Sequence, residues 1–230
     1  MADYEYDLLV IGAGPAGESA AMAGAKNNLK VGVVELQAQL GGNCTHKGTI
    51  PSKALRNAVK QAIRYKSHPL FRHIADNQPL TYPRILAAAS EVIPKQVKLH
   101  TEFFSRNRIQ VHEGRASFLN ETQIEVVDIQ GSKDVLNAKN ILIATGSRPY
   151  HPDDIDFSHP RVYDSDTILT MQHTPRTLII FGAGVIGCEY ASIFSGLGLK
   201  VDLINSRERL LSFLDDEISD ALSYHLRGNG

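Results

Sequence analysis

Cysteine, net charge and long apolar runs are scarce in this sequence, and each shortage argues against a class of protein. The two cysteines, Cys44 and Cys188, are too few for the disulfide framework of a small secreted fold. The net charge of −1 gives no broad attraction to nucleic acid or acidic lipid, so we expect neither as a partner. No stretch approaches the roughly 20 apolar residues that a membrane-spanning helix needs.

The N-terminal sequence argues against a secretory signal, and the histidines give no sign of a metal site. Residues 1–7 (MADYEYD) are acidic, whereas a secretory signal starts basic and continues apolar, so we expect a cytoplasmic protein without a membrane partner. The nine histidines show no paired spacing typical of metal ligands, and they give no support for a metal site.

A long-range repeat is the most informative feature of the chain. Residues 8–17 (LLVIGAGPAG) recur as residues 178–187 (LIIFGAGVIG), at an offset of 170 positions that continues without a gap. Residues 29–31 (LKV) accordingly recur as residues 199–201. Each copy reads as a buried strand, a glycine-rich turn, a helix of small residues and a second apolar strand, which together form a βαβ unit.

The glycine-rich turns are typical of dinucleotide binding. Each has the pattern G-x-G-x-x-G, in which the first glycine permits a tight turn and the second lets a pyrophosphate approach the backbone. The third glycine allows close packing of helix on strand, and the helix N-terminus attracts the phosphates. The six glycines are Gly12, Gly14, Gly17, Gly182, Gly184 and Gly187. A plain structural turn is the alternative, but a strand before and a helix after each copy favour two dinucleotide sites.

The ends of the second strands distinguish the two sites. Glu35 lies 18 residues past Gly17, where a carboxylate accepts hydrogen bonds from an adenosine ribose. The equivalent residue of the second copy is the neutral Asn205, which Arg207 and Arg209 follow. Because arginine can accept a 2′-phosphate that a carboxylate would repel, the second site is predicted to tolerate NADP(H). Alternatively, the two arginines form a solvated loop.

The segment between the copies shows helical and strand patterns. An amphipathic helix is predicted over residues 51–65, and a second apolar stripe runs from Ile85 to Phe103, where Pro94 should kink or split the helix. Strands are predicted over residues 109–111, 123–129 and 140–144, and a proline-containing connection over residues 150–176.

Four motifs occur in the order known from one family. They are the first glycine motif with Glu35, the segment 41–53 (GGNCTHKGTIPSK), the segment 144–149 (ATGSRP) and the segment 182–189 (GAGVIGCE). Over essentially its whole length the chain resembles the flavoprotein pyridine nucleotide–disulfide oxidoreductase family. The resemblance implies an α/β fold with two Rossmann-like domains, the first for FAD and the second, truncated here, for NAD(P).

The resemblance also implies domain boundaries. We expect an FAD-binding domain over residues 1–150 that needs a C-terminal segment to be complete, a connection over 151–175, and the start of an NAD(P)-binding domain over 176–230. The chain would then be the N-terminal portion of a longer protein, and full-length relatives are expected to be homodimers or larger homo-oligomers.

The family's functional residues transfer to matching positions. For FAD they are Gly12, Gly14, Gly17, Glu35, Leu36, Gly41, Gly42, Asn43, Cys44, Lys53, Ala116, Thr145 and Gly146. For the nicotinamide nucleotide they are Gly182, Gly184, Gly187, Glu189, Asn205 and Arg207. Lys53 and Glu189 resemble the catalytic ion pair beside flavin N5, although two unrelated surface charges are the alternative.

One departure from the family indicates the reaction. Disulfide reductases carry a second cysteine where this chain has Thr49, so Cys44 lacks a redox partner there. Cys188 begins the helix after the second glycine motif and is expected to pack there. Segments 44–53, 147–152 and 201–205 resemble a bacterial branch of the family that moves hydride from NADPH to NAD⁺ through FAD, with both nucleotides as substrates at one site in turn. The alternatives are an NAD(P)H-dependent dithiol or quinone reductase and a non-catalytic FAD-binding fragment.

Overall fold

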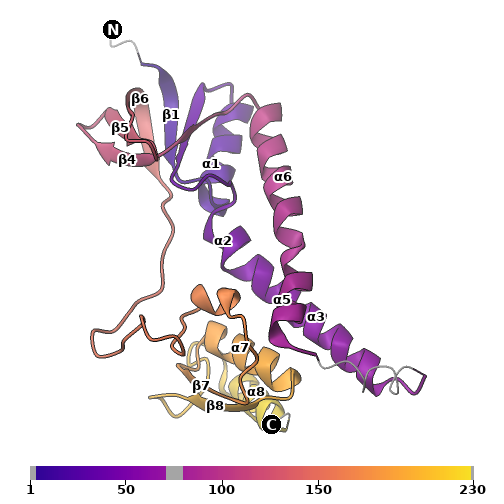
Figure 1. Cartoon of the computed structure of the whole chain (residues 1–230). Coiled ribbons are helices and arrows are strands. Elements are labelled where there is room, and N and C mark those ends of the chain that lie inside the picture. Colours follow the sequence, from indigo (N-terminus) through magenta and orange to yellow (C-terminus); the bar gives the residue numbers. More distant parts are fainter. Residues whose placement is uncertain (1–3, 71–79, 229–230) are drawn as a thin grey trace. The chain divides into compact units, whose positions relative to one another are not determined.

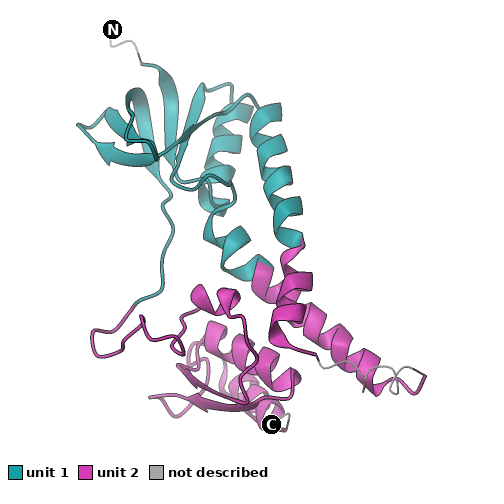
Figure 2. Cartoon of the chain, in the orientation of Figure 1, with its two compact units in different colours: residues 1–50, 92–150 teal, residues 51–91, 151–230 magenta. Residues whose placement is uncertain are grey.

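The computed structural model describes residues 4–70 and 80–228 and divides into two compact units, each containing helices and strands (Figures 1 and 2). Unit 1 comprises residues 1–50 and 92–150, and unit 2 comprises residues 51–91 and 151–230. The predicted α/β class is confirmed, because the larger sheet is mainly parallel. Residues 1–3 of the acidic N-terminus lie outside the described part of the chain.

The sheet of unit 1 has six strands in the order β3-β2-β1-β6-β5-β4. Their bounds are β1 Tyr6–Ile11, β2 Val31–Glu35, β3 Gln110–Glu113, β4 Arg115–Phe118, β5 Gln123–Val127 and β6 Lys133–Ile143. Strands β1, β2, β3 and the second half of β6 are parallel, whereas β4 and β5 form an antiparallel meander with the first half of β6. The parallel strands end at one edge of the sheet, where α/β proteins bind their ligands.

Strand β1 shows why these residues form a central strand. Its side chains alternate between two faces: Val10 joins one buried cluster, and Leu9 and Ile11 join the other. The first cluster packs under helices α1 (Pro15–Lys26) and α6 (Val92–Arg106), through residues such as Phe104. The second packs against the meander, through residues such as Ile124. The strand is therefore covered on both faces, as a β-branched run predicts.

The meander was only partly predicted. Strand β5 begins at the predicted Gln123 but ends at Val127, because Asp128 accepts backbone hydrogen bonds that close a turn to Ser132. Strand β4 and the first half of β6 were not predicted. Strand β4 is largely exposed, and the first half of β6 buries only Leu136 and Ala138, an alternation too short to indicate a strand.

Unit 2 is built around a two-stranded parallel sheet, β7-β8. Helix α3 (Thr49–Ser67) belongs to unit 2 from residue 51 onward. The other elements of the unit are α5 (Tyr82–Ser90), the 3-10 helix η1 (Thr167–Thr170), β7 (Thr177–Phe181), α7 (Val185–Gly196), β8 (Lys200–Ile204) and α8 (Asp216–Gly228). The apolar core joins Leu55 and Val59 of α3 to Ile193 and Phe194 of α7. Residues 51–91 thus pack with residues 151–230.

The predicted break at Pro94 is confirmed. Helix α5 ends at Ser90 and α6 begins at Val92, so that Pro94 lies in the first turn of the second helix. A proline at this position cannot donate to the carbonyl of Ser90, and the helix cannot continue through Glu91 with regular hydrogen bonds.

The segment before β7 is anchored by Asp164. Its carboxylate accepts hydrogen bonds from the backbone N–H groups of Asp166 and Thr167, and His151 Nε2 lies 2.7 Å from Asp164 Oδ2. The His151 ring stacks on Phe157 with centroids 3.8 Å apart. This connection is therefore fixed to unit 2 by polar contacts as well as by the buried Ile168.

Candidate functional site

The first glycine turn divides its glycines between fold and ligand. Gly12 has φ +106°, and a Cβ there would lie 2.4 Å from the Ala144 carbonyl oxygen. A Cβ on Gly17 would lie 1.8 Å from the Gly12 carbonyl oxygen. By contrast, a Cβ on Gly14 would meet nothing nearer than Gly42 Cα at 3.8 Å. Gly12 and Gly17 therefore close the turn, while the space beside Gly14, at the N-terminus of α1, is open to a phosphate.

Glu35 fixes the glycine turn from the end of β2. It is buried, and its Oε2 accepts a hydrogen bond from Ala13 N at 2.6 Å while Oε1 accepts one from Gln37 N at 2.9 Å. Each carboxylate oxygen keeps a second acceptor position for a ribose hydroxyl. Leu36, the next residue, is 60% exposed and offers apolar surface beside this position.

The segment after Glu35 returns to the glycine turn. Gly41 N donates to Ala13 O at 3.2 Å, and Gly41 and Gly42 both have positive φ, at 108° and 57°. A Cβ on Gly42 would lie 2.7 Å from Gly14 Cα, so two glycine backbones touch here. Helix α2 (Gly42–His46) follows, and Asn43 Nδ2 donates to Ser147 O. The structure thus brings together residues 12–14, 41–43 and 147.

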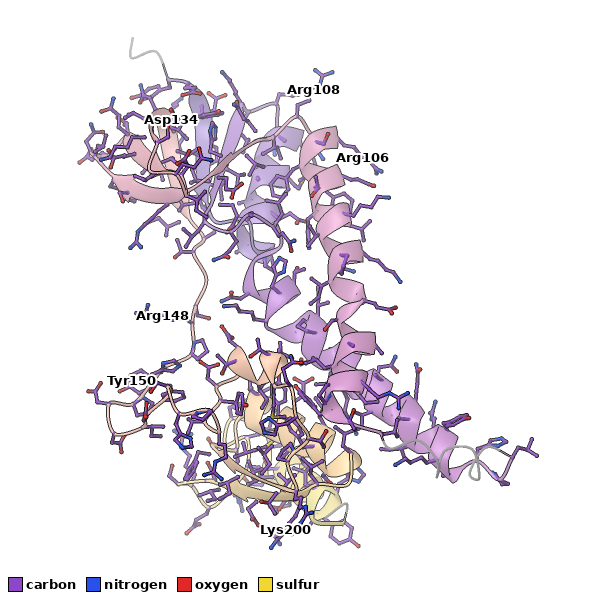
Figure 3. The ribbon with its side chains drawn as sticks, viewed as in Figure 1. Arg106, Arg108, Asp134, Arg148, Tyr150 and Lys200 are labelled. Carbon is purple, nitrogen blue, oxygen red and sulfur yellow. The ribbon has the colours of Figure 1, made fainter. Side chains whose placement is uncertain are left out.

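The remaining predicted FAD residues of unit 1 lie after strand β6 and on strand β4. Thr145 and Gly146 follow β6 at the carboxyl edge of the sheet, on the extended segment where Figure 3 labels Arg148 and Tyr150. Ala116 lies on β4, and Gly114 N donates to Glu35 O at 2.8 Å, which sets this stretch beside the end of β2.

The two cysteines are both free thiols. Cys44 in α2 is half-buried, and Cys188 in α7 is buried. Burial raises the pKa of the Cys188 thiol, so it stays protonated and packs as a small apolar side chain.

The second glycine turn repeats the first in detail. Gly182 N donates to Ile204 O at 2.8 Å, as Gly12 N donates to Val34 O at 2.7 Å. Leu211 N donates to Ala183 O at 3.1 Å, the counterpart of the bond from Gly41 to Ala13. The offset of 170 positions therefore holds for backbone hydrogen bonds as well as for residue types.

The glycines of the second turn have the same division of roles. A Cβ on Gly187 would lie 1.9 Å from Gly182 O, whereas a Cβ on Gly184 would meet no described atom within 4 Å. Gly182 has φ +98°, which favours glycine even though the described residues leave open space around it. The place beside Gly184 can therefore receive a phosphate.

Asn205 replaces Glu35 and holds two loops. Its Oδ1 accepts a hydrogen bond from Ala183 N at 3.3 Å, and its Nδ2 donates to the carbonyl oxygens of Arg207 and Arg209 at 2.9 and 3.0 Å. Only an amide supplies an acceptor on one side and two donors on the other. Asn205 therefore connects the glycine turn to the loop that carries the two arginines.

The two arginines differ in their partners. Arg209 forms an ion pair with Asp216 at the start of α8, whereas Arg207 Nη1 donates to the neutral Ser212 hydroxyl at 2.5 Å. A hydroxyl carries no charge, and no carboxylate of residues 4–70 and 80–228 forms an ion pair with Arg207, which makes it the better partner for an added phosphate.

Lys53 and Glu189 form the predicted ion pair within unit 2. Lys53 Nζ lies 3.4 Å from Glu189 Oε1, and the side chains are 68% and 21% exposed. Ser52 Oγ donates to Glu189 Oε2 at 3.1 Å, so the carboxylate is fixed by a buried hydroxyl and the ammonium stays accessible. Ser52 was not predicted as a site residue, although it stands in the Ile-Pro-Ser-Lys motif.

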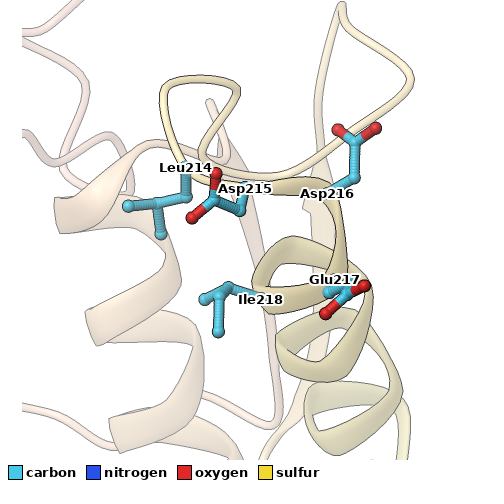
Figure 4. Close-up of a pocket in the computed structure, with 5 residues that line it drawn as sticks. All are labelled: Leu214, Asp215, Asp216, Glu217 and Ile218. Atoms are coloured by element: carbon cyan, nitrogen blue, oxygen red, sulfur yellow. The ribbon is translucent and has the colours of Figure 1, made fainter.

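A hollow on unit 2 lies apart from these residues. It is lined by Leu214, Asp215, Asp216, Glu217 and Ile218 at the start of α8 (Figure 4). None of the predicted site residues lines it, and its three carboxylates are unsuited to phosphate groups, so we assign it no role in nucleotide binding.

Two further findings concern metals and membranes. Within residues 4–70 and 80–228, no group of three or more His, Cys, Asp or Glu side chains could hold a metal ion. No helix in these described ranges is long and apolar enough to cross a membrane.

Comparisons with known proteins find relatives over the whole chain. The chain is 63% identical over 230 residues to the soluble pyridine nucleotide transhydrogenase of Hahella chejuensis (strain KCTC 2396), covering 100% of this chain and 50% of that protein. It is 61% identical over 229 residues to the protein of the same name from Stutzerimonas stutzeri (strain A1501), covering 49% of it. The chain thus spans about half the length of the curated relatives that it matches.

A solved structure and a family model extend the comparison. The Cu(II) complex of the HOCl-induced flavoprotein disulfide reductase RclA from Escherichia coli is similar with a TM-score of 0.83 and 27% identity, over 99% of this chain and 48% of that one. The model of the pyridine nucleotide-disulphide oxidoreductases matches residues 6–230. The chain therefore belongs to the pyridine nucleotide-disulphide oxidoreductase family.

Proposed function

We propose that this chain is the nucleotide-binding part of an FAD-dependent transhydrogenase that passes hydride from NADPH to NAD⁺. The observation that carries the proposal is the pair of equivalent glycine turns, open at Gly14 and at Gly184 and followed by Glu35 in one copy and Asn205 in the other. Two sites of different ribose chemistry suit two different dinucleotides.

The first site is proposed to hold FAD. The open space beside Gly14 at the N-terminus of α1 suits the pyrophosphate, and the Glu35 carboxylate has acceptor positions left for the adenosine ribose. Gly41, Gly42 and Asn43 extend the same surface. When bound, FAD would supply the hydride acceptor and donor that no amino-acid side chain provides.

The second site is proposed to bind NADPH and NAD⁺ in turn. The backbone beside Gly184 suits a pyrophosphate in either nucleotide. Asn205 is neutral, so it neither repels a 2′-phosphate nor requires one, and Arg207 supplies a positive charge when the phosphate is present. A site with these properties can accept both substrates.

Lys53 and Glu189 are proposed as the catalytic pair. The Glu189 carboxylate lies 3.4 Å from the Lys53 ammonium and favours a position for this positive charge beside α7. Such a charge stabilises negative charge that develops nearby, and Ser52 in turn holds the Glu189 carboxylate. The segment 41–53 has one thiol, Cys44, and carries Thr49 where disulfide reductases carry a second cysteine. A dithiol relay in this segment is therefore not expected as the route for electrons.

The name shared by the close relatives supports the same reaction, because a soluble pyridine nucleotide transhydrogenase transfers hydride between these nucleotides. The disulfide reductase alternative has no comparable support in this chain, in which a redox-active pair would need a second cysteine close to Cys44.

The proposal is tested by the visible absorption of the purified chain. We expect co-purifying flavin bands that bleach when NADPH is added without oxygen and recover when NAD⁺ follows. Initial rates at several concentrations of both nucleotides should give parallel lines in double-reciprocal plots, because the nucleotides use one site in turn. A flavin that stays oxidised under NADPH, or a rate that requires both nucleotides bound together, would contradict the proposal.

A further inference from the structure

A nearly buried polar network lies beside the first glycine turn and has no place in the function described so far. His100 of α6 contacts the Glu18 carboxylate through Nδ1 and lies 3.1 Å from the Thr45 hydroxyl through Nε2. The Glu18 and His100 side chains are only 18% and 15% exposed, and Thr45 is buried. One imidazole thus connects α1, α6 and α2.

The chemistry of the three groups assigns one proton of the network. An ionised carboxylate only accepts hydrogen bonds, so Nδ1 of His100 carries the proton that it donates to Glu18. Nε2 then either accepts from the Thr45 hydroxyl or, in the imidazolium form, donates to it. In both cases the Nδ1–H group of the imidazole orients the Glu18 carboxylate.

The charge of Glu18 matters because of where it stands. Glu18 lies in the first turn of α1, and its backbone N–H bonds to Gly14 O, next to the space open to a phosphate. The N-terminus of a helix attracts negative charge through its dipole and its free N–H groups. A free carboxylate in the first turn would therefore compete with a pyrophosphate for this attraction. Cys188 occupies this position in the second copy and brings no charge.

At the other end of the network, Thr45 and His100 pack against the Gly41–Gly42 turn, which lies beside Gly14. A Cβ on Gly41 would lie 2.4 Å from Thr45 Oγ1 and 2.9 Å from His100 Cδ2, so these two side chains pack directly over Gly41. Gly41 leads into Gly42, which touches Gly14. A shift of His100 would therefore move the Gly41–Gly42 turn against the Gly14 turn.

We propose that His100 is a positioning residue of the dinucleotide site of unit 1, holding the Glu18 carboxylate toward α6 and packing with Thr45 over Gly41, so that the place beside Gly14 accepts an anionic pyrophosphate. This role rests on the proposed FAD site. It assigns His100 and Thr45 to binding without contact with the ligand.

The test is the affinity for FAD of the 230-residue chain and of the variants Glu18→Gln, His100→Gln and Glu18→Gln with His100→Gln. Fluorescence quenching of added FAD gives the affinities, and thermal unfolding without FAD gives the stability of each variant. We expect His100→Gln to weaken FAD binding about tenfold, since it frees a carboxylate at a helix N-terminus. The double variant should return to within about threefold of the parent, because the freed charge is gone.

The rescue separates positioning from a merely structural role. A general loss of packing would lower the affinity of the double variant at least as much as that of His100→Gln, and that result would overturn the proposal. Thr45→Val should also bind FAD less tightly, whereas Thr45→Ser, which keeps the hydroxyl, should bind like the parent. A parent that binds no FAD overturns the proposed function and this role together, whereas equal affinities in a parent that binds FAD overturn the role of His100 alone.

Discussion

The turns at Gly12 and Gly182 have the same backbone but different neighbours. Both have positive φ, both donate to the end of the second strand, and both receive the close approach of the third glycine. Around Gly12 the carbonyl of Ala144 fills the space, because β6 pairs with β1, while the described residues leave that space open around Gly182. The glycine motif thus determines the backbone conformation of the turn, whereas the surrounding residues determine how much stability a substitution of the first glycine costs.

The two copies also differ in charge. Glu18 and Glu35 place two carboxylates beside the first turn, and Cys188 and Asn205 place none at the equivalent positions of the second. Under the proposed function, Glu35 would bind a ribose with two free hydroxyls, and the neutral Asn205 would tolerate a third phosphate. Substitutions at equivalent positions test this comparison directly.

The largest effect is expected at the third glycines, and it should be equal in both copies. In Gly17→Ala and Gly187→Ala the new methyl group would lie 1.8 and 1.9 Å from a carbonyl oxygen, so helix and strand must separate. Each unit should lose about 3 kcal/mol or more of its free energy of unfolding. Hydrogen exchange read by mass spectrometry reports each unit separately.

The matched control for these variants is Gly14→Ala. Its methyl group meets no atom closer than 3.8 Å, so the fold should stay stable while FAD binding is lost. Equal stability losses in Gly14→Ala and Gly17→Ala would contradict the division of roles among the glycines.

Substitutions of the first glycines, Gly12 and Gly182, should differ in their cost to stability. Gly182→Ala meets only backbone strain at φ +98°, with a cost of about 1–2 kcal/mol. Gly12→Ala meets similar strain and also the Ala144 oxygen at 2.4 Å, so it should cost at least about 1 kcal/mol more. Urea unfolding monitored in each unit measures the difference, and indistinguishable costs would show that β6 does not confine the first turn.

A pH-dependent difference is expected from the anchor before the second copy. Burial on its own raises the pKa of Asp164, but hydrogen bonds from the backbone of Thr167 and from His151 outweigh it and lower the pKa to about 2. A lowered pKa means stability that is present above the ordinary value of 3.8 and is lost as the pH falls through about 2. Asp164→Asn should therefore lower the stability of unit 2 by roughly 1–2 kcal/mol at pH 7.

Urea midpoints at pH 7, 4 and 3 check this linkage. The gap between the parent and Asp164→Asn should shrink between pH 4 and pH 3, because the unfolded carboxyl group then takes up its proton while the folded one still resists. Unit 1 serves as the internal control, and a gap that stays constant with pH would refute the anchoring role of the charge.

The smallest effect concerns the choice of nucleotide at the second copy. Arg207→Ala should weaken NADP(H) binding about tenfold and NAD(H) binding hardly at all, because only the former carries the 2′-phosphate. Arg209→Ala is the control, since Asp216 already holds its guanidinium and the effect should be smaller. Equal losses for both nucleotides in Arg207→Ala would favour a solvated loop without a role in selection.

The sequence predicted most reliably what depends on short-range pattern. Both βαβ units, the break near Pro94 and the helix predicted over residues 51–65 (α3) appear where the apolar period, glycine and proline place them. Strand β4 was missed because it is largely exposed, and the first half of β6 was missed because its two buried residues, Leu136 and Ala138, are too few to define a period. Their pairing comes from neighbouring strands, which no local window contains.

Long-range packing was the other gap. Nothing local to Leu55 indicates that it shares a core with Phe194, so the sequence did not predict that residues 51–91 pack with residues 151–230. The same limit hid Ser52 and His100, whose partners Glu189 and Glu18 stand 137 and 82 positions away. A polar residue on a helix looks like a solvated one until its distant partner is known.

Strand β6 has a consequence for the order in which unit 1 forms. Leu8 pairs with Val31 early in the chain, but its other neighbour is Asn140, which is synthesised much later. The entropy of closing this large loop is lost before the new contacts form, so β6, the last strand of unit 1 to be synthesised, is expected to limit the folding rate of unit 1. Until it arrives, β1 has an unpaired edge that a chaperone or a neighbouring nascent chain can occupy.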